Sequence, residues 1–281
     1  MNFRTDLASE AHEISRGEAT EIEGVISETQ KLDELEITTV EVINEQGANA
    51  IGKSVGKYIT ISVPELKYSA ESYQKAVAAL AAQIKLLSGA HKNTLTLVVG
   101  LGNNDITPDR IGNMAVSQIM VTHHMKKHAP EIFTDEISPV CAIAPGVLGT
   151  TGMETSDIIK SIADDLKPDL IIVVDALAAA DYSRIGTTVQ VSDAGIQPGA
   201  GVGNNRNALN KESLGIPVIA VGVPTVVDAS AITDGENTQP LMVTPRDIDL
   251  IVKKCAKAIA GGINLALQDS MSLSEIEEYV G

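Results

Sequence analysis

The 281-residue chain has no tryptophan, and its aromatic residues together make up only 2% of the sequence. Because 44% of the residues are nevertheless hydrophobic, the chain can bury a large core, and that core must be aliphatic. No apolar run approaches the roughly 20 residues that a membrane-spanning helix needs. The opening letters MNFRTD also contain no apolar signal core. We therefore expect a cytoplasmic protein without a membrane segment.

Positive charge and cysteine are also scarce. There are 21 Lys and Arg residues against 37 Asp and Glu, a net charge of -16. Since nucleic-acid-binding proteins usually present a basic surface, we expect no direct contact with nucleic acid. Cys141 and Cys255 are the two cysteines, and both stand among apolar residues. This indicates core thiols in a reducing compartment rather than a disulfide framework or a CxxC metal motif.

Apolar runs that alternate with helical patterns indicate the fold class. Tyr73, Val77, Leu80, Ile84 and Leu87 recur at helical spacing and predict an amphipathic helix over 72–88. The same criteria predict strands at 37–43, 58–63, 95–99, 140–144, 170–174, 187–191 and 217–221. They predict further helices at 18–31, 111–128 and 156–166, the last capped by Thr155 or Ser156, and one that starts at Pro245 with Thr244 as its N-cap.

This alternation predicts an α/β fold with a mostly parallel, mixed and twisted sheet and helices on both faces, of a phosphorylase- or hydrolase-like type. The sequence contains no repeat, low-complexity tract or linker, so we expect a single domain over residues 1–281.

Two aspartates follow predicted buried strands. The apolar run IIVV ends in Asp175, and the strand over 95–99 opens into the loop GLGNNDITPD, which ends in Asp109. If the two strands are parallel, both acids emerge at the same edge of the sheet, where α/β proteins place their working sites. Two close carboxylates cannot both ionise easily, so one keeps a proton and the pair can activate a water molecule. Taken singly, Asp109 also suits the first turn of a helix and Asp175 a helix cap.

Glycine-rich loops follow several of the strands. The letters GLGN at 100–103 suggest a dinucleotide loop, but Asp105 replaces the third glycine, so a tight turn is the simpler interpretation and no nucleotide cofactor is expected. The loop PGAGVGNNR over 198–206 suits close approach to an extended ligand. Its last residue, Arg206, can bind a carboxylate or form an ordinary surface salt bridge. Glu154, in another loop, is either structural or holds a substrate or metal.

Other catalytic motifs are incomplete. His124 and His128 have the spacing of a zinc-binding helix, but the glutamate is missing and two lysines lie between them, so we expect a solvated helix face and no metal site. The sequence contains no GxSxG motif. The letters DAG at 193–195 echo an aspartic-protease motif, yet no second copy exists and the α/β pattern does not suit that fold.

In combination, these motifs resemble the spore germination protease family over nearly the whole chain. The matching segments are VGLGN with TPD (99–109), PGV with GMETSDII (145–159), VDALAA (174–179), GAGVGN (199–204), 215–228 and LMVTP (241–245). The family is in turn similar to hydrogenase maturation proteases, which carry a Gly-x-Gly-Asn loop and an acid where Asp109 falls.

The resemblance implies a sequence-specific endopeptidase that degrades small acid-soluble spore proteins during germination, in the forespore or spore core. It implies catalytic roles for Asp109 and Asp175, an assembly of four identical subunits, and synthesis as a zymogen. No histidine matches the one near the two acids of the hydrogenase proteases, so we expect no metal and no cofactor. The residues expected to bind or support the substrate are Gly102, Asn103, Thr107, Glu154, Gly201, Asn204 and Arg206.

The segment TDLASE at 5–10 resembles the Thr-Glu-(Phe/Ile)-Ala-Ser-Glu site that the family cleaves in its substrates. We therefore expect self-cleavage between Asp6 and Leu7, which makes residues 1–6 a candidate pro-segment. The chain departs from the family in two ways: its pro-segment is short, and residues 227–240 form a short connection where many members carry a long insertion. These departures affect the expected zymogen mechanism and subunit contacts more than the expected chemistry. Two alternatives remain open: a non-catalytic peptide-binding or chaperone-like module, and a nucleoside-type hydrolase on the same scaffold.

Overall fold

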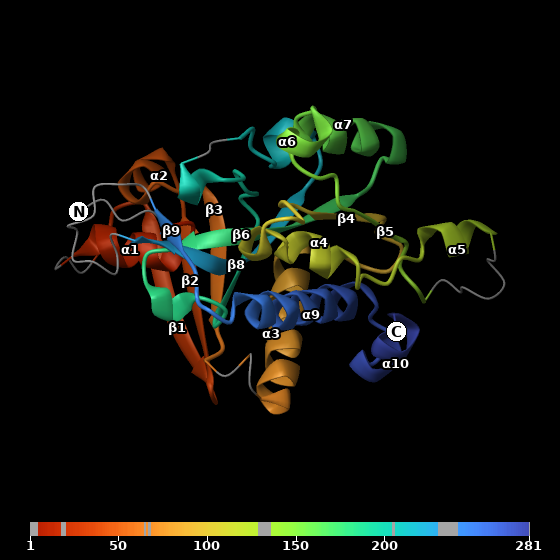
Figure 1. The fold of residues 1–281 in the computed structure, drawn as a ribbon, viewed down its shortest axis with the longest axis horizontal. Coiled ribbons are helices and arrows are strands. Elements are labelled where there is room, and N and C mark those ends of the chain that lie inside the picture. Colours follow the sequence, from red (N-terminus) through yellow and green to blue (C-terminus); the bar gives the residue numbers. More distant parts are fainter. Residues whose placement is uncertain are drawn as a thin grey trace.

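The computed structural model describes residues 5–17, 21–64, 66, 69–128, 136–203, 206–229 and 241–280. Its centre is one mixed sheet of nine strands in the order β1-β2-β3-β7-β8-β6-β4-β5, with β9 paired to β8 (Figure 1). The parallel part consists of β5 (Val140–Ile143), β4 (Thr96–Gly100), β6 (Leu170–Ala179) and β8 (Val218–Asp228). The antiparallel part consists of β7 (Thr188–Ser192), β3 (Gly56–Ser62), β2 (Leu35–Val42), β1 (Val25–Leu32) and β9 (Met242–Val243).

Helices cover both faces of the sheet (Figure 1). One face packs against α3 (Ala70–Ser88), α4 (Ile111–Val116) and α9 (Ile248–Leu267) through the larger core cluster. The opposite face packs against α7 (Thr155–Leu166) and α8 (Lys211–Leu214) through a second cluster, near the short helix α6 (Leu148–Thr151). A third cluster joins α1 (Ala8–Arg16) and α2 (Glu45–Ile51) to β2 and β3. The predicted α/β fold, with a mixed sheet and helices on both faces, is thus confirmed. The sheet is not mostly parallel, however: among the described strands, three of the eight pairings are parallel and five are antiparallel.

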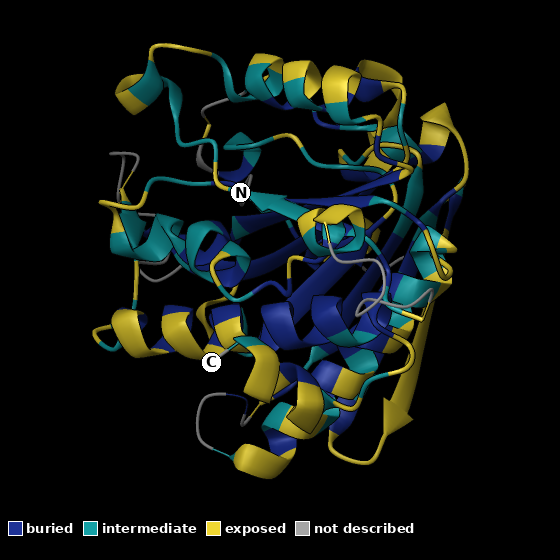
Figure 2. Cartoon of the chain, turned by 90° about the vertical axis from the view of Figure 1, so that its right-hand side faces the viewer, coloured by how far each residue is buried: buried dark blue, intermediate teal, exposed yellow. Residues whose placement is uncertain are grey.

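The parallel strands form the buried centre of the molecule (Figure 2). Every residue of β4 is buried, and nine of the ten residues of β6 are. This agrees with continuous apolar runs rather than alternation, because helices cover both faces of these strands. The helix predicted at 72–88 is α3, which begins after Ser69, whose hydroxyl accepts the N–H of Ser72 at 3.2 Å.

The helix predicted at 18–31 is wrong. Residues 25–32 form β1, which pairs with β2 in an antiparallel hairpin, and residues 18–20 lie outside the described residues. Only Val25 of this strand is buried. The polar composition that suggested a helix instead gives an exposed outer strand, because backbone pairing with β2 outweighs local preference. The helix α1 lies further toward the N-terminus, at Ala8–Arg16.

The single helix predicted at 111–128 is interrupted. It forms α4, which ends at Val116, and α5 (His123–His128). Long-range hydrogen bonds explain the break: the Asn264 side chain on α9 accepts the N–H of Met120 at 2.9 Å, and the Val140 carbonyl accepts the N–H of Thr122 at 3.0 Å. These two N–H groups therefore donate to α9 and β5 and not to the carbonyls four residues earlier that would continue the helix.

Two predicted helix caps are also wrong. The Thr244 hydroxyl donates to the Thr225 carbonyl at 2.8 Å, and α9 starts only at Ile248, after Asp247. Thr155 is the first residue of α7 and its hydroxyl donates to the Gly146 carbonyl at 3.1 Å. The two hydroxyls thus bind the carbonyls of β8 and of the loop at Gly146 instead of capping helices.

The two cysteines and the histidines of α5 lie in different environments. Cys255 is fully buried in the larger cluster and Cys141 is half-buried against the second one. His124 and His128 are exposed on α5, as a solvated face requires. In the part of the chain that the structure describes, no helix has the length and apolar character to cross a membrane. The final helix, α10 (Leu273–Val280), packs against α9.

Candidate active site

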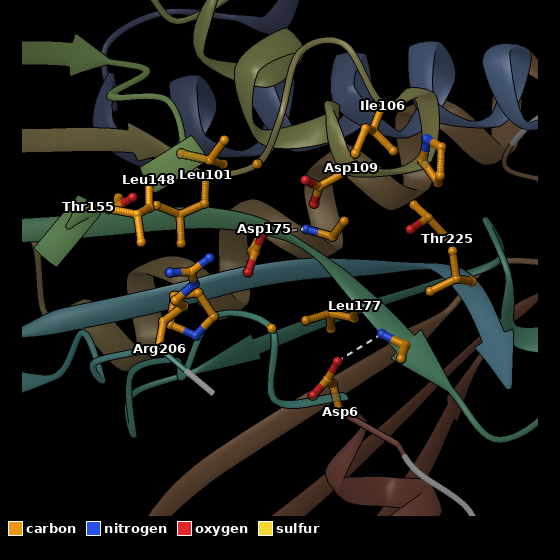
Figure 3. Close-up of a pocket in the computed structure, with 18 of the residues that line it drawn as sticks. Asp6, Leu101, Ile106, Asp109, Leu148, Thr155, Asp175, Leu177, Arg206 and Thr225 are labelled. Carbon is orange, nitrogen blue, oxygen red and sulfur yellow. Dashed lines mark hydrogen bonds between the residues drawn. The ribbon is translucent and has the colours of Figure 1, made fainter. Parts of the chain in front are cut away.

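A cavity of about 440 Å³ lies along β6, beyond the point where β4 ends (Figure 3). Much of its wall is apolar, and the acids Asp6, Asp109, Glu154 and Asp175 line it together with one cation, Arg206, among the described residues. Representative apolar residues of the wall are Leu101, Ile106, Pro108, Leu148, Leu177 and Met242. The cavity therefore combines an apolar surface with a concentration of carboxylates.

Asp175 belongs to β6, opposite Gly222 of β8. The predicted strand stopped at residue 174, whereas β6 continues through Ala179, so Asp175 is a mid-strand residue and not a strand-end cap. It reaches the cavity because the pairing of β4 with β6 ends one residue earlier, at Val174. Only 5% of Asp175 is exposed, and its carboxylate accepts the N–H of Ala176 at 2.9 Å.

Asp109 approaches from the loop that follows β4. It closes the short 3-10 helix η1 (Thr107–Asp109), just before α4, and its carboxylate accepts the N–H of Asn103 at 2.7 Å. Gly102 makes this loop possible: its φ is +109°, and a Cβ there would lie 1.7 Å from the Asp109 carbonyl oxygen. The glycine of the loop therefore serves close backbone packing around Asp109.

The two carboxylates influence each other. Burial raises the pKa of Asp175 well above its usual value, and the nearby charge of Asp109 raises it further, against the opposing effect of the Ala176 hydrogen bond. Burial also raises the pKa of Asp109, partly offset by the hydrogen bond from Asn103. Figure 3 shows both side chains pointing into the cavity. The more deeply buried Asp175 is therefore the better candidate for the protonated acid, and Asp109 is the better candidate for the carboxylate.

Arg206 and Glu154 form an ion pair on another part of the cavity wall. Their closest nitrogen and oxygen atoms are 3.5 Å apart, and both side chains are about one third exposed. The salt bridge considered for Arg206 thus exists, and it lies at the cavity. Because partly exposed pairs of this kind are weak, a ligand carboxylate can compete for the guanidinium at little cost.

The N-terminal segment also enters the site. The Asp6 carboxylate accepts the N–H of Ala178 at 2.8 Å, and the Asp6 N–H donates to the Ala178 carbonyl at 2.8 Å (Figure 3). Gly201 leaves room for this carboxylate, since a Cβ there would lie 2.1 Å from Asp6 Oδ2. The next residue, Leu7, is 0% exposed and belongs to the larger core cluster. Of the two residues joined by the Asp6–Leu7 bond, Asp6 therefore lines the cavity and Leu7 is packed in the core.

Several polar groups hold this segment in place. The Lys53 ammonium donates to the Thr5 carbonyl at 2.8 Å. Burial raises the pKa of Asp6 above its usual value, and the charge of Lys53 partly opposes this rise. Glu10 accepts the N–H groups of Ala180 at 2.8 Å and Asp181 at 3.0 Å. These contacts come from separate parts of the chain, so the segment is fixed by tertiary structure.

A second side-chain contact fixes the backbone around the Asp6–Leu7 bond. The Gln190 side chain, on β7, accepts the N–H of Ala8 at 2.8 Å and donates to the Asp6 carbonyl at 3.2 Å. The carbonyl of the predicted cleavage site is therefore bound to Gln190 rather than presented to Asp109 and Asp175.

The other predicted site residues are placed differently. Asn103 supports Asp109 through its backbone, and Gly201 contacts Asp6. Thr107 starts η1, but its neighbours Ile106 and Pro108 line the cavity in its place. Asn204 lies outside the described residues.

Some residues at the cavity or beside the N-terminal segment carried no signal in the sequence. Lys53 follows a short helix that the apolar pattern did not predict, and Gln190 is a polar residue within a buried strand. Thr225 lies on the part of β8 that extends beyond the predicted strand. The position of Thr225 depends on the pairing of β6 with β8, which continues as far as Val227 and which the local sequence does not reveal.

Within the described ranges, no three His, Cys, Asp or Glu side chains are grouped so that they could hold a metal ion.

Comparison with known proteins identifies the family. The model of the germination protease family matches residues 4–238. The chain belongs to the germination protease family. A germination protease of Clostridium perfringens (strain ATCC 13124) is 42% identical over 322 residues and covers 99% of each chain. One from Caldanaerobacter subterraneus subsp. tengcongensis is 42% identical and covers 100% of this chain and 98% of the relative.

Other matches cover less of the two chains. A germination protease of Geobacillus sp. (strain WCH70) is 47% identical over 244 residues, which are 83% of this chain and 65% of the relative. Among solved structures, a NiFe hydrogenase maturation protease from Thermococcus kodakarensis KOD1 covers 62% of this chain and 96% of its own, with 18% identity and a TM-score of 0.34. Membership in the germination protease family makes the chain a peptidase, and the resemblance inferred from its motifs is confirmed.

Proposed function

We propose that this germination protease is an aspartic-type endopeptidase in which Asp109 and Asp175 activate a water molecule. The observation that carries the proposal is the pair of carboxylates in one cavity, with Asp175 5% exposed and its pKa raised by burial and by Asp109. Asp109 takes a proton from the attacking water while Asp175 gives its proton to the carbonyl oxygen of the peptide bond. Asp109 then passes its proton to the leaving amine while one hydroxyl of the tetrahedral intermediate returns a proton to Asp175, so the C–N bond breaks without a covalent intermediate and both acids regain their starting state.

The surrounding groups supply binding. The apolar wall suits an apolar side chain, the backbone of the glycine loop at Gly102 is available to polarise the carbonyl, and Arg206 offers its guanidinium to a carboxylate of the peptide. We propose small acid-soluble spore proteins as the substrates, in the forespore or spore core, and an assembly of four identical subunits. The family resemblance supports these three assignments.

We also propose that the chain is made as a zymogen that is cut between Asp6 and Leu7. Because Leu7 is fully buried and the Asp6 carbonyl is bound by Gln190, the segment must leave its position before the bond can enter any active site. The N-terminal residue of active protein, determined by mass spectrometry, tests this point: it should be Leu7, and an active protein that still starts at Met1 or Asn2 contradicts it.

The catalytic proposal is tested with a peptide spanning Phe3–Glu13 and the trimmed protein. Mass spectrometry should find one cut, after Asp6, that disappears in both Asp109→Asn and Asp175→Asn. Asp105→Asn is the matched control, because Asp105 is an exposed acid in the same loop as Asp109. Cleavage that persists in either of the first two variants refutes the two-acid mechanism, and an intact peptide in every sample favours a non-catalytic peptide-binding module.

A further inference from the structure

The side chain of Asn113, on α4, contacts the loop that carries Asp109. Its Nδ2 donates to the carbonyl of Gly102 at 3.1 Å. Chemistry fixes this orientation of the amide, because a carbonyl oxygen only accepts hydrogen bonds and therefore selects the amide nitrogen over the amide oxygen. The contact joins the first turn of α4 to the loop that follows β4.

The Gly102 carbonyl belongs to the same peptide group as the Asn103 N–H, which donates to Asp109 Oδ2 at 2.7 Å. Among the described residues no peptide bond is cis, so this carbonyl and this N–H point in opposite directions. Asn113 and Asp109 therefore hold the two ends of one peptide group. Hydrogen bonds that are linked in this way polarise one another, so each strengthens the other.

This peptide group follows a glycine and can rotate more easily than most. Gly102 has a φ of +109°, and glycine allows backbone angles that a side chain would block. If the peptide group turned over, its carbonyl oxygen would face the Asp109 carboxylate, and the two negative oxygens would repel each other. The bond from Asn113 opposes this rotation, because the Gly102 carbonyl would lose its donor.

Close backbone packing keeps Asn113 in place. The preceding residue, Gly112, lies against both central strands: a Cβ there would be 2.3 Å from the Leu101 carbonyl oxygen and 2.5 Å from the Val174 carbonyl oxygen. Because α4 packs this closely on the end of β4 and on β6, its backbone has little room to move, and the Asn113 amide is a fixed donor for the loop.

The stability of the fold does not explain an amide at this position. Asn113 Oδ1 is buried and has no hydrogen-bond partner among the described residues. A buried acceptor without a partner lowers the free energy of unfolding, and an apolar side chain of similar size would avoid this cost. Asn113 therefore contributes through its donor, the group that reaches Gly102.

We infer that Asn113 is a positioning residue: its side chain fixes the Gly102–Asn103 peptide group, and this peptide group holds the Asp109 carboxylate at the cavity. The inference rests on the proposed catalytic role of Asp109 and specifies what keeps its carboxylate in place. The other titratable group that faces Asp109 is Asp175 of β6. The remaining charged residues of the cavity are Asp6, Glu154 and Arg206.

An NMR measurement tests the inference without any requirement for turnover. In the full chain labelled with 15N at asparagine, the Asn103 amide signal should move as Asp109 ionises, and Asp109→Asn should abolish this movement and so identify the signal. In Asn113→Leu the Asn103 N–H should exchange with solvent roughly 5- to 10-fold faster. Its titration should move to higher pH, because a weaker bond from Asn103 favours the carboxylate less and the pKa of Asp109 rises. The substitution changes none of the charges at the cavity.

Ser117→Ala is the matched control. Ser117 lies one turn further along the chain, and its hydroxyl donates to the Met114 carbonyl at 2.8 Å instead of to the loop. This variant should keep the exchange rate and the titration of the wild type. Asn113→Ala removes the same donor without adding bulk and replaces Asn113→Leu if that chain does not fold. An Asn103 signal that exchanges and titrates as in the wild type, in a folded Asn113 variant, overturns the inference.

The pH dependence of peptide cleavage separates this inference from the proposed function. For the Phe3–Glu13 peptide, the acidic limb of kcat/KM should move to higher pH in Asn113→Leu, and the rate should recover as the pH rises. An equal loss of rate at every pH would indicate a merely structural role and would contradict the inference. If the NMR signal changes but the pH profile does not, Asn113 positions Asp109 as inferred, and it is the catalytic role of Asp109 that fails.

Discussion

Replacing Asp175 by asparagine should strongly lower turnover and, at high pH, make the protein more stable. The folded-state pKa of Asp175 is raised above its usual value of 3.8, chiefly by burial. Between the unfolded and folded pKa values, the folded protein holds a proton that the unfolded chain has released. The free energy of unfolding therefore falls as pH rises through this window, and the loss is complete above the folded pKa. Asparagine does not titrate, so the variant escapes this loss.

The size of the effect follows from the same linkage. Each pKa unit between the folded and unfolded states corresponds to about 1.4 kcal/mol of stability. The variant's advantage should thus be small near pH 4 and should grow as the pH rises, until the pH passes the raised pKa of Asp175. Loss of the general acid should at the same time lower kcat by roughly 10²- to 10⁴-fold. The assays are urea unfolding at pH 4, 6 and 8 and hydrolysis of the Phe3–Glu13 peptide.

Asp105→Asn is the control for both assays, because it replaces an exposed acid of the loop that carries Asp109 and should leave stability and rate as in the wild type. The reasoning is refuted if the stability difference between Asp175→Asn and wild type is independent of pH, or if it shrinks as pH rises. Either result would mean that Asp175 is ionised in the folded protein without a penalty. In that case it could not serve as the acid of the pair.

Three further predictions concern the surroundings of the site. Gly201→Ala should lower the free energy of unfolding by about 1–3 kcal/mol in urea titrations, because its Cβ would lie 2.1 Å from a carboxylate oxygen, whereas Gly149→Ala meets nothing within 4 Å and should be neutral. Leu7→Ala should cost about 2–5 kcal/mol in the same assay, and Leu250→Ala, at a residue 39% exposed, should cost much less. Arg206→Ala should raise KM for the peptide with little change in kcat, and an unchanged KM would exclude the guanidinium from binding.

The central strands and their two acids follow from the sequence because their signal is local. Continuous apolar runs mark β4 and β6, and parallel strands bring the residues after Gly100 next to those after Val174. Asp109 and Asp175 line one cavity for this reason. Their separate positions were less well predicted, since the length of β6 depends on its long register with β8 and not on its own composition.

The errors arise where distant residues decide the local structure. The polar segment 25–32 is a strand only because β2 pairs with it, and the helix after Ile111 stops because Asn264 binds the N–H of Met120. Lys53 lies at the site because the fold brings the end of α2 to the N-terminal segment. No periodicity or motif records these contacts, so the position of Lys53 beside the N-terminal segment was not predictable from the sequence.

The position of the Asp6–Leu7 bond has a consequence for maturation. Asp6 fills space beside the acids, while Leu7 fills space in the aliphatic core. A cut between them would remove Asp6 from the space beside the acids and would leave Leu7 packed in the core. The shape and charge of the cleft would change while the contacts that hold the fold together stayed in place. Activation would then depend on Asp6 and folding on Leu7. A substitution at one of these neighbouring residues could change its own process without changing the other.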